Sequence, residues 1–348
     1  MPTKHRPARF VTAHGAWVWL LLVTACGGSD AERAKTHDGK PDTPTSSDDS
    51  RAPSPSAGDP QAPSPSVAVA ANDAMTQAPF DATPSPDGKQ VYYTALGRDE
   101  SGDAVPGVFT VAASGGAIST LALGDPLTAP VNISVSLDGQ TLFVADPAAS
   151  AVFTLAASGG TPSPLAGTSG YAPRGLVVAK GEDKRQYLYF SGRAPDTQAA
   201  GVFRIDPAGG AVQTLASGAP FEDPAGVAVD AKGAVYVVEA STERASARVI
   251  RVEGDKPTTF VEGIGIGFPA GITLTRDDTT LLVSGLDPDS KRDVVYFVDV
   301  ATQKISRFTK AVGEFHEPAG LHRAHDADVF AWADSQANEN GTVYVLEP

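Results

Sequence analysis

The chain has 348 residues, of which 41% are apolar, 7% aromatic and 20% charged. Its single cysteine excludes an internal disulfide framework and a zinc-thiolate cluster. The only apolar run near membrane length lies at the extreme N-terminus, which excludes a polytopic membrane protein. With 41 acidic and 27 basic side chains the formal net charge is -14, so we expect no nucleic-acid partner.

The N-terminal residues have the pattern of an export signal. Lys4, Arg6 and Arg9 form a basic start that contains no acid. The apolar run that follows, residues 16–23 (AWVWLLLV), is too short to span a bilayer as a helix. These features predict export from the cytoplasm.

Residues 23–27 (VTACG) resemble the bacterial lipobox, in which a cysteine receives a diacylglyceryl group before cleavage. The resemblance implies a signal peptide over residues 1–25, lipidation of Cys26 and a membrane partner reached through the lipid anchor. Gly27, where an aspartate would favour retention in the inner membrane, implies the outer membrane of the bacterial cell envelope. We predict that residues 26–66 are a lipidated cysteine followed by a disordered tether. Residues 27–66 contain no Val, Ile, Leu, Met, Phe, Trp or Tyr, so they cannot form a hydrophobic core.

One apolar, strand-like motif then occurs six times at spacings of 45–51 residues. Its copies are 91–95 (VYYTA), 142–146 (LFVAD), 188–192 (LYFSG), 236–240 (YVVEA), 281–285 (LLVSG) and 330–334 (FAWAD). A second motif follows each copy and begins at residues 107, 151, 201, 248, 294 and 342. A proline that opens a shorter strand precedes each copy, at positions 79, 130, 173, 224, 269 and 318. A turn and a fourth strand-like segment follow the second motif, as in 161–166 (TPSPLA) and 211–216 (AVQTLA).

Four strands in each of six repeats, with no helical periodicity, predict an all-β fold: a six-bladed β-propeller of four-stranded blades over residues 67–348. The sixth repeat lacks a fourth strand after its third. Residues 67–88 align without a gap with residues 118–139, which pairs Val67 with the start of a fourth strand. We therefore expect an N-terminal strand near residues 67–71 to complete the last blade.

Residues 85–95 (SPDGKQVYYTA) and 136–146 (SLDGQTLFVAD) resemble the blade repeats of TolB-type propellers. Residues 224–240 (PAGVAVDAKGAVYVVEA) resemble NHL and SMP-30/gluconolactonase blades. These resemblances imply blades, and blades host many functions.

The gluconolactonase resemblance implies a divalent metal in the channel. The places that correspond to that family's ligands hold Phe80, Val131 and Ala225, none of which is a metal ligand. Asp81 and Asn132 stand one place later, where strand alternation turns them the other way. We therefore predict no metal site, no cofactor and no catalytic residue. The alternative is a metal-dependent propeller hydrolase or lyase with a calcium-like ion in its channel.

The ring has three imidazoles, His316, His322 and His325, all in its sixth repeat. His322 and His325 are three residues apart, which predicts opposite faces if both lie on one strand. The sequence contains no nucleophile elbow, zinc-protease motif or P-loop.

Loop lengths predict which face of the propeller binds. The loops before each first strand and after each second strand emerge on the same face, and that face carries the long segments: 96–106, 193–200, 241–247, 286–293 and 335–341. We expect the opposite face to be closed by tight Asp-Gly and Gly-Gly turns. The candidate residues at the channel mouth are Asp81, Asn132, Arg174, Glu222, Asp223, His316 and Glu317.

Blades three and six are opposed in a six-bladed ring, so Arg174 is expected to face Glu317 across the channel.

Together these patterns predict a lipid-anchored, exported binding or scaffolding module. Its expected partner is an envelope protein or a small polar ligand, and an enzymatic activity is not favoured.

Overall fold

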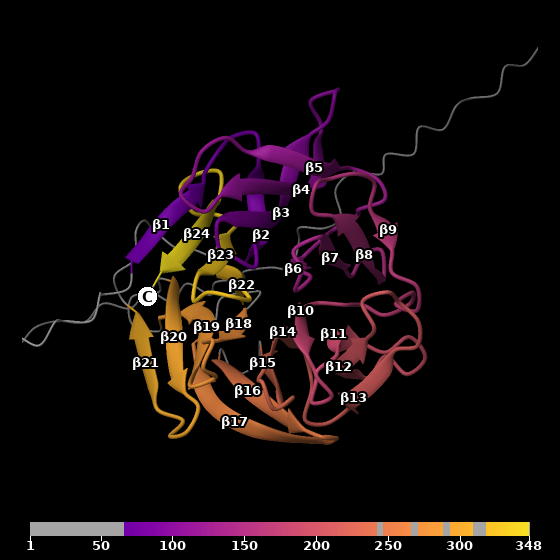
Figure 1. Ribbon diagram of the computed structural model, residues 1–348, viewed down its shortest axis with the longest axis vertical. Helices are drawn as coiled ribbons and strands as arrows, with labels where there is room; N and C mark the ends of the chain where they lie inside the picture. The colour runs from indigo at the N-terminus through magenta and orange to yellow at the C-terminus, as the bar shows by residue number, and fades with distance from the viewer. Residues whose placement is uncertain (1–65, 242–245, 266–270, 288–292, 309–317, 348) are drawn as a thin grey trace, which may run out of the picture. The chain divides into compact units, whose positions relative to one another are not determined.

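The computed structural model describes residues 66–347, except 242–245, 266–270, 288–292 and 309–317. These residues form 24 strands in six antiparallel sheets of four, and they contain no helix. The sheets surround a central axis as the blades of a propeller (Figure 1), which confirms the predicted fold. No described residue belongs to a helix with the length and apolar character needed to cross a membrane.

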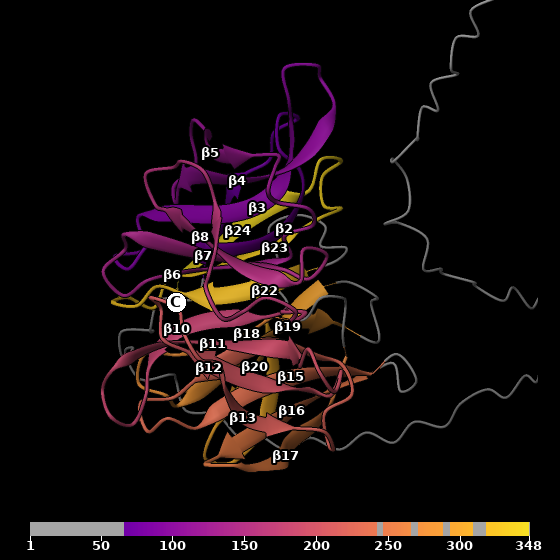
Figure 2. The same cartoon turned by 90° about the vertical axis from the view of Figure 1, so that its right-hand side faces the viewer.

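The first strand of each blade lies nearest the axis (Figure 1). Each of these strands begins at the repeated proline of its blade or a few residues before or after it. In the side view of Figure 2 the strands run roughly along the axis, so each inner strand begins at one face of the ring and ends at the other. The inner strands are β2 (Gln77–Pro84), β6 (Asn132–Val135), β10 (Leu176–Lys180), β14 (Pro224–Val229), β18 (Ile272–Leu274) and β22 (Pro318–Arg323).

The two repeated apolar motifs form the middle strands of the blades. The second strands are β3 (Gln90–Arg98), β7 (Thr141–Asp146), β11 (Gln186–Arg193), β15 (Val235–Ser241), β19 (Thr280–Leu286) and β23 (Phe330–Asp334). The third strands are β4 (Ala104–Ala112), β8 (Ala151–Ala156), β12 (Ala200–Ile205), β16 (Ser246–Glu253), β20 (Asp293–Asp299) and β24 (Thr342–Glu347). Their motifs are continuously apolar because both faces of a blade are covered: Tyr92 and Val108 of one blade pack with Ile133 and Val144 of the next. The core therefore lies between blades.

The fourth strands form the outer edge of the ring. They are β5 (Ser119–Leu123), β9 (Ser163–Pro164), β13 (Gln213–Ser217), β17 (Lys256–Ile264), β21 (Ile305–Phe308) and, in blade six, β1 (Ser66–Ala71). The strand β9 is only two residues long. Pro162 and Pro164 lack the N–H group that a longer ladder would need, so the expected fourth strand is shortened there.

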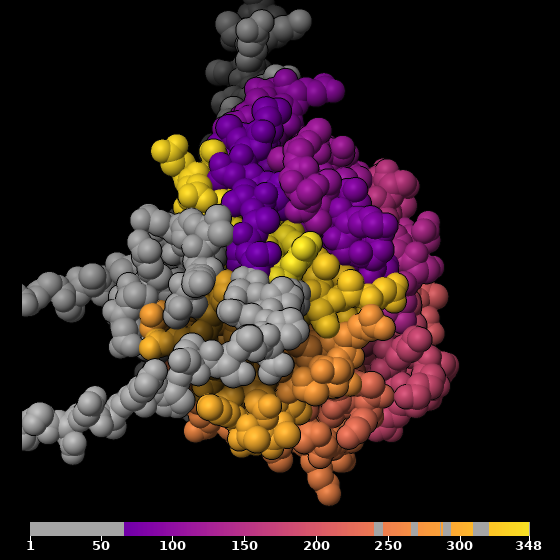
Figure 3. All heavy atoms as spheres, turned by 60° about the vertical axis from the view of Figure 1, so that its left-hand side comes forward, coloured from indigo at the N-terminus to yellow at the C-terminus, as the bar shows by residue number. Residues whose placement is uncertain are grey.

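The two ends of the ring meet in blade six, as predicted. The strand β1 pairs antiparallel with β24, with Val67 opposite Leu346 and Val69 opposite Tyr344. Val67 is 8% exposed and packs into the core, whereas Val69 is 38% exposed. Figure 3 shows the first described residues, in indigo, against the yellow residues of blade six. The predicted signal peptide over residues 1–25 and the predicted tether over residues 26–66, apart from Ser66, lie outside the described residues.

One expected long loop proves to be mostly strand. Within residues 96–106, Leu96 pairs with Pro106 and Arg98 with Ala104, so β3 and β4 continue as a long hairpin. Only residues 99–103 connect them, and a hydrogen bond from the Arg98 side chain to the Gly102 carbonyl oxygen supports the tip.

Candidate functional site: a polar cavity in the channel

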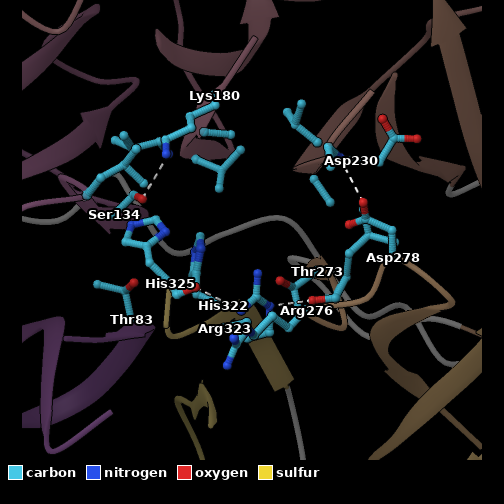
Figure 4. Close-up of a pocket in the computed structure, with 18 of the residues that line it drawn as sticks. Thr83, Ser134, Lys180, Asp230, Thr273, Arg276, Asp278, His322, Arg323 and His325 are labelled. Atoms are coloured by element: carbon cyan, nitrogen blue, oxygen red, sulfur yellow. Dashed lines mark hydrogen bonds between the residues drawn. The ribbon is translucent and has the colours of Figure 1, made fainter. Parts of the chain in front are cut away.

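The inner strands line a cavity of about 430 Å³ around the propeller axis (Figure 4). In every blade the fourth residue after the repeated proline lines this cavity. These six residues are Thr83, Ser134, Val177, Ala228, Thr273 and His322. Four of the six side chains can form hydrogen bonds, so the channel wall is polar at this level.

The cavity continues to the ends of the inner strands and to the turns that follow them. These segments contribute apolar walls, such as Leu137 and Val229, together with three basic, three acidic and one imidazole group. The ionisable residues are Lys180, Asp230, Arg276, Asp278, Arg323, His325 and Asp326. The expectation that tight turns close this face of the ring is wrong, since the turns surround a cavity.

His322 connects the cavity to a buried carboxylate. Its Nε2 lies 2.9 Å from Oδ2 of Asp81, which has no exposed surface. The same oxygen accepts a hydrogen bond from the Ile133 backbone N–H at 2.8 Å, and Asp81 Oδ1 accepts one from Ala82 N–H at 2.8 Å. Asp81 thus contacts blade two through a backbone N–H and blade six through the His322 imidazole.

His325 lies just beyond the end of β22. Its Nε2 is 2.9 Å from the Val135 carbonyl oxygen, so this nitrogen carries the hydrogen. Burial, with a smaller contribution from the positive charge of Arg323, lowers the pKa of His325 and favours the neutral ring. His322 and His325 line the same cavity, and the prediction of opposite faces does not apply because it assumed that both lie on one strand. The strand ends at Arg323, and its alternation does not extend into the turn.

The basic side chains of the cavity differ in how their donors are used. Arg323 donates from Nε to the Leu274 carbonyl oxygen at 2.7 Å and from Nη1 to the Ala324 carbonyl oxygen at 2.6 Å. Burial lowers the pKa of this guanidinium group. Its bond to Leu274 therefore joins blades five and six. Arg276 donates from Nη1 to the Asp326 carbonyl oxygen at 3.0 Å. The side chain of Lys180 is exposed.

Asp230 and Asp278 place two carboxylates of neighbouring blades on one side of the cavity (Figure 4). Oδ1 of Asp230 accepts hydrogen bonds from the Lys232 and Ala234 backbone N–H groups at 2.9 and 2.8 Å. Oδ2 of Asp278 accepts one from Ala231 N–H at 2.8 Å. Burial and the charge of Asp230 raise the pKa of Asp278. The turn backbones therefore hold both carboxylates, and the positive charge of Arg323 partly offsets the effect of burial on Asp278.

Two of the predicted mouth residues, Asp81 and Asn132, are buried and bind the backbone of the next blade. Asn132 Oδ1 accepts a hydrogen bond from Leu176 N–H at 2.9 Å, as Asp81 does from Ile133. Neither residue lines the channel cavity. Both side chains therefore hold blades together at this point of the ring.

The structure brings three other predicted mouth residues together near the start of β14. Arg174 Nη1 forms an ion pair with Asp223 Oδ1 at 2.8 Å, and Glu222 Oε1 lies 3.2 Å from Nη2 of Arg248. His316 and Glu317 lie outside the described residues, and so does the expected juxtaposition of Arg174 with Glu317.

A buried carboxylate supports this charged group. Oε1 of Glu239 accepts hydrogen bonds from the backbone N–H groups of Glu222, at 2.7 Å, and of Asp223. Its Oε2 is buried without a hydrogen-bond partner, and burial raises the pKa of this carboxyl group. Glu239 thus fixes the backbone from which Glu222 and Asp223 extend.

The places that the gluconolactonase resemblance assigns to metal ligands do not fit a metal. Phe80, Val131 and Ala225 have no donor atom in their side chains. Among the described residues, no three histidine, cysteine or acidic side chains are grouped so that they could hold an ion. Cys26, the predicted lipidation site, lies outside the described part of the chain.

The candidate mouth was predicted at the residues next to each proline, so among the cavity residues only His322 and His325 were named from the sequence. The signal that identifies them is the fourth position after that proline, which is polar in Thr83, Ser134, Thr273 and His322. Period-two alternation from the proline does not identify this position, because the ladders of β2, β14 and β22 shift register beside the proline.

The sequence matches no protein-family model and no curated protein. In structure the chain is similar to the PQQ-bound aldose sugar dehydrogenase from Streptomyces coelicolor, at 14% identity over 82% of this chain and 98% of that chain, with a TM-score of 0.57. It is also similar to the gluconolactonase XC5397 from Xanthomonas campestris (16% identity, 78% and 87% covered, TM-score 0.53). A third similar structure is TolB from Acinetobacter baumannii (14% identity, 70% and 57% covered, TM-score 0.52). At these identities the likeness shows the fold alone: a propeller whose structural neighbours include TolB and a gluconolactonase, as the blade motifs indicated.

Proposed function

We propose that this protein is an exported, lipid-anchored component of the bacterial cell envelope whose propeller binds a small polar ligand in its channel. The observation that supports binding is the cavity of about 430 Å³, in which polar and charged side chains converge between apolar walls. Small-molecule sites have volumes of about 300–1,000 Å³ and combine apolar walls with a few placed polar groups.

A metal-dependent propeller hydrolase or lyase is less well supported, because Phe80, Val131 and Ala225 stand at the places of the metal ligands. Binding requires only the groups that line the cavity. We therefore favour a binding module over an enzyme.

The proposal predicts that filling the channel abolishes binding. Val177 lines the cavity and is half-buried, so Val177→Trp places an indole in the ligand's space. Ligands are first identified by ligand-detected NMR of a metabolite mixture with the full-length protein. We expect Val177→Trp to weaken the binding of each channel ligand at least tenfold. Thr259→Trp, on the exposed side of β17, is expected to change it less than twofold.

The predicted mouth is the second candidate surface, and it suits an envelope protein as partner. The ion pairs Arg174 with Asp223 and Arg248 with Glu222, held above the buried Glu239, favour it. Arg174→Ala serves as a further arm of the NMR experiment. Ligand binding that is lost in Arg174→Ala and retained in Val177→Trp would reject the channel in favour of the mouth.

The proposed lipid anchor predicts that Cys26→Ala removes acyl labelling and leaves this site uncleaved, because a thioether requires the cysteine thiol. Metabolic labelling with an alkyne fatty acid and mass spectrometry of the mature N-terminus measure both effects. Gly27→Asp tests the membrane: in a sucrose gradient the labelled protein is expected to move from the outer to the inner membrane fraction. An unmodified wild-type N-terminus at a residue other than Cys26 would contradict the anchor.

A further inference from the structure

Glu239, near the end of β15, has one carboxylate oxygen that no described residue satisfies. The residue is 1% exposed, and its Oε1 accepts hydrogen bonds from the backbone N–H groups of Glu222, at 2.7 Å, and of Asp223. Its Oε2 is also buried, and no described residue donates to it. A buried ionised carboxylate needs donors for its oxygens, so this arrangement compensates a full negative charge only in part.

The corresponding carboxylate of blade two is fully satisfied. Asp146, at the end of β7, has no exposed surface and also holds the loop before an inner strand. Its Oδ2 accepts a hydrogen bond from Thr128 N–H at 2.7 Å, and its Oδ1 accepts one from Ala149 N–H at 3.0 Å. The N–H group of Ala129 lies 3.1 and 3.0 Å from the two oxygens. The oxygen without a donor therefore distinguishes Glu239 from its counterpart.

The charges around Glu239 do not replace the missing donor. Arg248 lies opposite Glu239 in the β15–β16 ladder, but its Nη2 donates to a backbone carbonyl oxygen at 2.6 Å and lies 3.2 Å from Glu222 Oε1. Asp223 is a like charge, and it pairs with Arg174. Burial has the largest effect on Glu239 and raises the pKa of its carboxyl group, while the two backbone N–H groups and Arg248 oppose the rise.

The loop of residues 218–223, between β13 and β14, rests on this carboxyl group. Its Glu222 and Asp223 donate their N–H groups to Oε1, and their side chains form the ion pairs of the mouth with Arg248 and Arg174. Because Oε2 is buried, water reaches it only when the surrounding structure opens. The loop belongs to no strand, so its opening breaks no ladder of the blade.

We propose that Glu239 is a proton-dependent latch on the loop of residues 218–223. With its proton the carboxyl group holds the loop closed, and loss of the proton favours an open loop in which the carboxylate is hydrated and the ion pairs of the mouth are released. This inference goes beyond the proposed function and does not depend on which ligand the channel binds.

The direction of the pH dependence follows from linkage between protonation and folding. The pKa of Glu239 in the closed structure lies above the ordinary value of a glutamic acid. The contribution of this group to stability is therefore complete below the ordinary pKa and is lost as the pH rises through the raised one. The closed loop is thus favoured in acid.

Hydrogen exchange of the detergent-solubilised full-length protein, followed by mass spectrometry between pH 4.5 and pH 8, tests the proposal. Exchange rates are divided by those of unstructured peptides at each pH, which gives protection factors. We expect the protection of the Glu222 and Asp223 amides to fall at least tenfold as the pH rises. The amides of Thr128 and Ala129, held by Asp146, are the internal control and are expected to change less than twofold.

Glu239→Gln keeps the shape and an acceptor for both N–H groups but cannot ionise. It is expected to make the protection of the loop independent of pH and to raise the Tm at pH 8 with little change at pH 4.5. Asp146→Asn, the matched variant, is expected to lower the Tm at both pH values, because its amide nitrogen faces N–H groups that need an acceptor. Wild-type protection of the loop that does not change with pH, or an equal fall in Glu239→Gln, would overturn the inference.

Discussion

Asp81→Ala is expected to destabilise the contacts between blades by about 2–6 kcal/mol, because two buried donors of other blades lose their acceptor and each costs about 1–3 kcal/mol. The donors are His322 Nε2 of blade six and Ile133 N–H of blade two, and both reach Oδ2 of Asp81 in blade one. One carboxylate therefore connects three blades. For a domain of this size the loss corresponds to a decrease in Tm of about 5–15 °C, measured by calorimetry.

Asn132→Ala is the graded control for this prediction. Asn132 occupies the corresponding place in blade two, and its Oδ1 accepts a single hydrogen bond from Leu176 N–H. Its removal leaves one donor without an acceptor and is expected to lower the Tm by about half as much as Asp81→Ala does. If the Tm of Asp81→Ala stays within 2 °C of the wild type, the carboxylate does not hold the blades together.

The second residue after each repeated proline explains why Asp81 has this role. In blades three to six this residue is a glycine, and a Cβ on Gly175 would lie 2.3 Å from the Ala225 carbonyl oxygen of the next blade. A Cβ on Gly320 would lie 1.5 Å from Asp81 Oδ1. Neighbouring backbones thus approach closely after blade three, whereas the side chains of Asp81 and Asn132 fill the equivalent space in blades one and two.

The fold was predictable from the sequence because the same pattern of apolar motifs and a proline occurs in all six blades. Six copies of two apolar motifs and a proline indicate the blade number, and the gapless match of residues 67–88 with 118–139 identifies the closing strand. The lengths of individual strands were less predictable. Local chemistry decides them, as the prolines at 162 and 164 do for β9, and as pairing of Leu96 with Pro106 does for the β3–β4 hairpin.

The candidate site was harder to predict because it depends on where strands end and on contacts between blades. His325 joins His322 in the cavity only because β22 ends at Arg323. Arg174 pairs with Asp223 of the adjacent blade, a contact that its place in the repeat does not indicate. Periodicity within one strand contains no information on such contacts between distant segments.

Deletion of residues 27–72 is expected to unfold the ring or leave it marginally stable, because it removes β1. Burial of Val67 contributes about 1.5–3 kcal/mol, and each ladder hydrogen bond between β1 and β24 about 0.5–1.5 kcal/mol. The side chain of Asn72 also donates to the Gly341 carbonyl oxygen at 2.9 Å and to Thr342 Oγ1 at 3.0 Å. The combined loss approaches the stability of a whole domain, about 5–15 kcal/mol. Thermal unfolding and size-exclusion chromatography measure it, since an exposed β24 edge also favours aggregation.

Two matched comparisons of melting temperature separate the effect of β1 from that of the tether, and the effect of a buried position of β1 from that of an exposed one. Deletion of residues 27–63 leaves β1 intact, and its segment contains none of the large apolar residues that a core requires, so the Tm is expected to change by less than 2 °C. Val67→Asp puts a charge among Leu282, Trp332 and Leu346 and is expected to reproduce much of the loss. Ala68→Asp, at the exposed neighbouring residue on the opposite face of the same strand, is expected to be nearly neutral. Equal melting temperatures for the two deletions would show that blade six is stable with three strands and that the ring does not depend on its N-terminal closure.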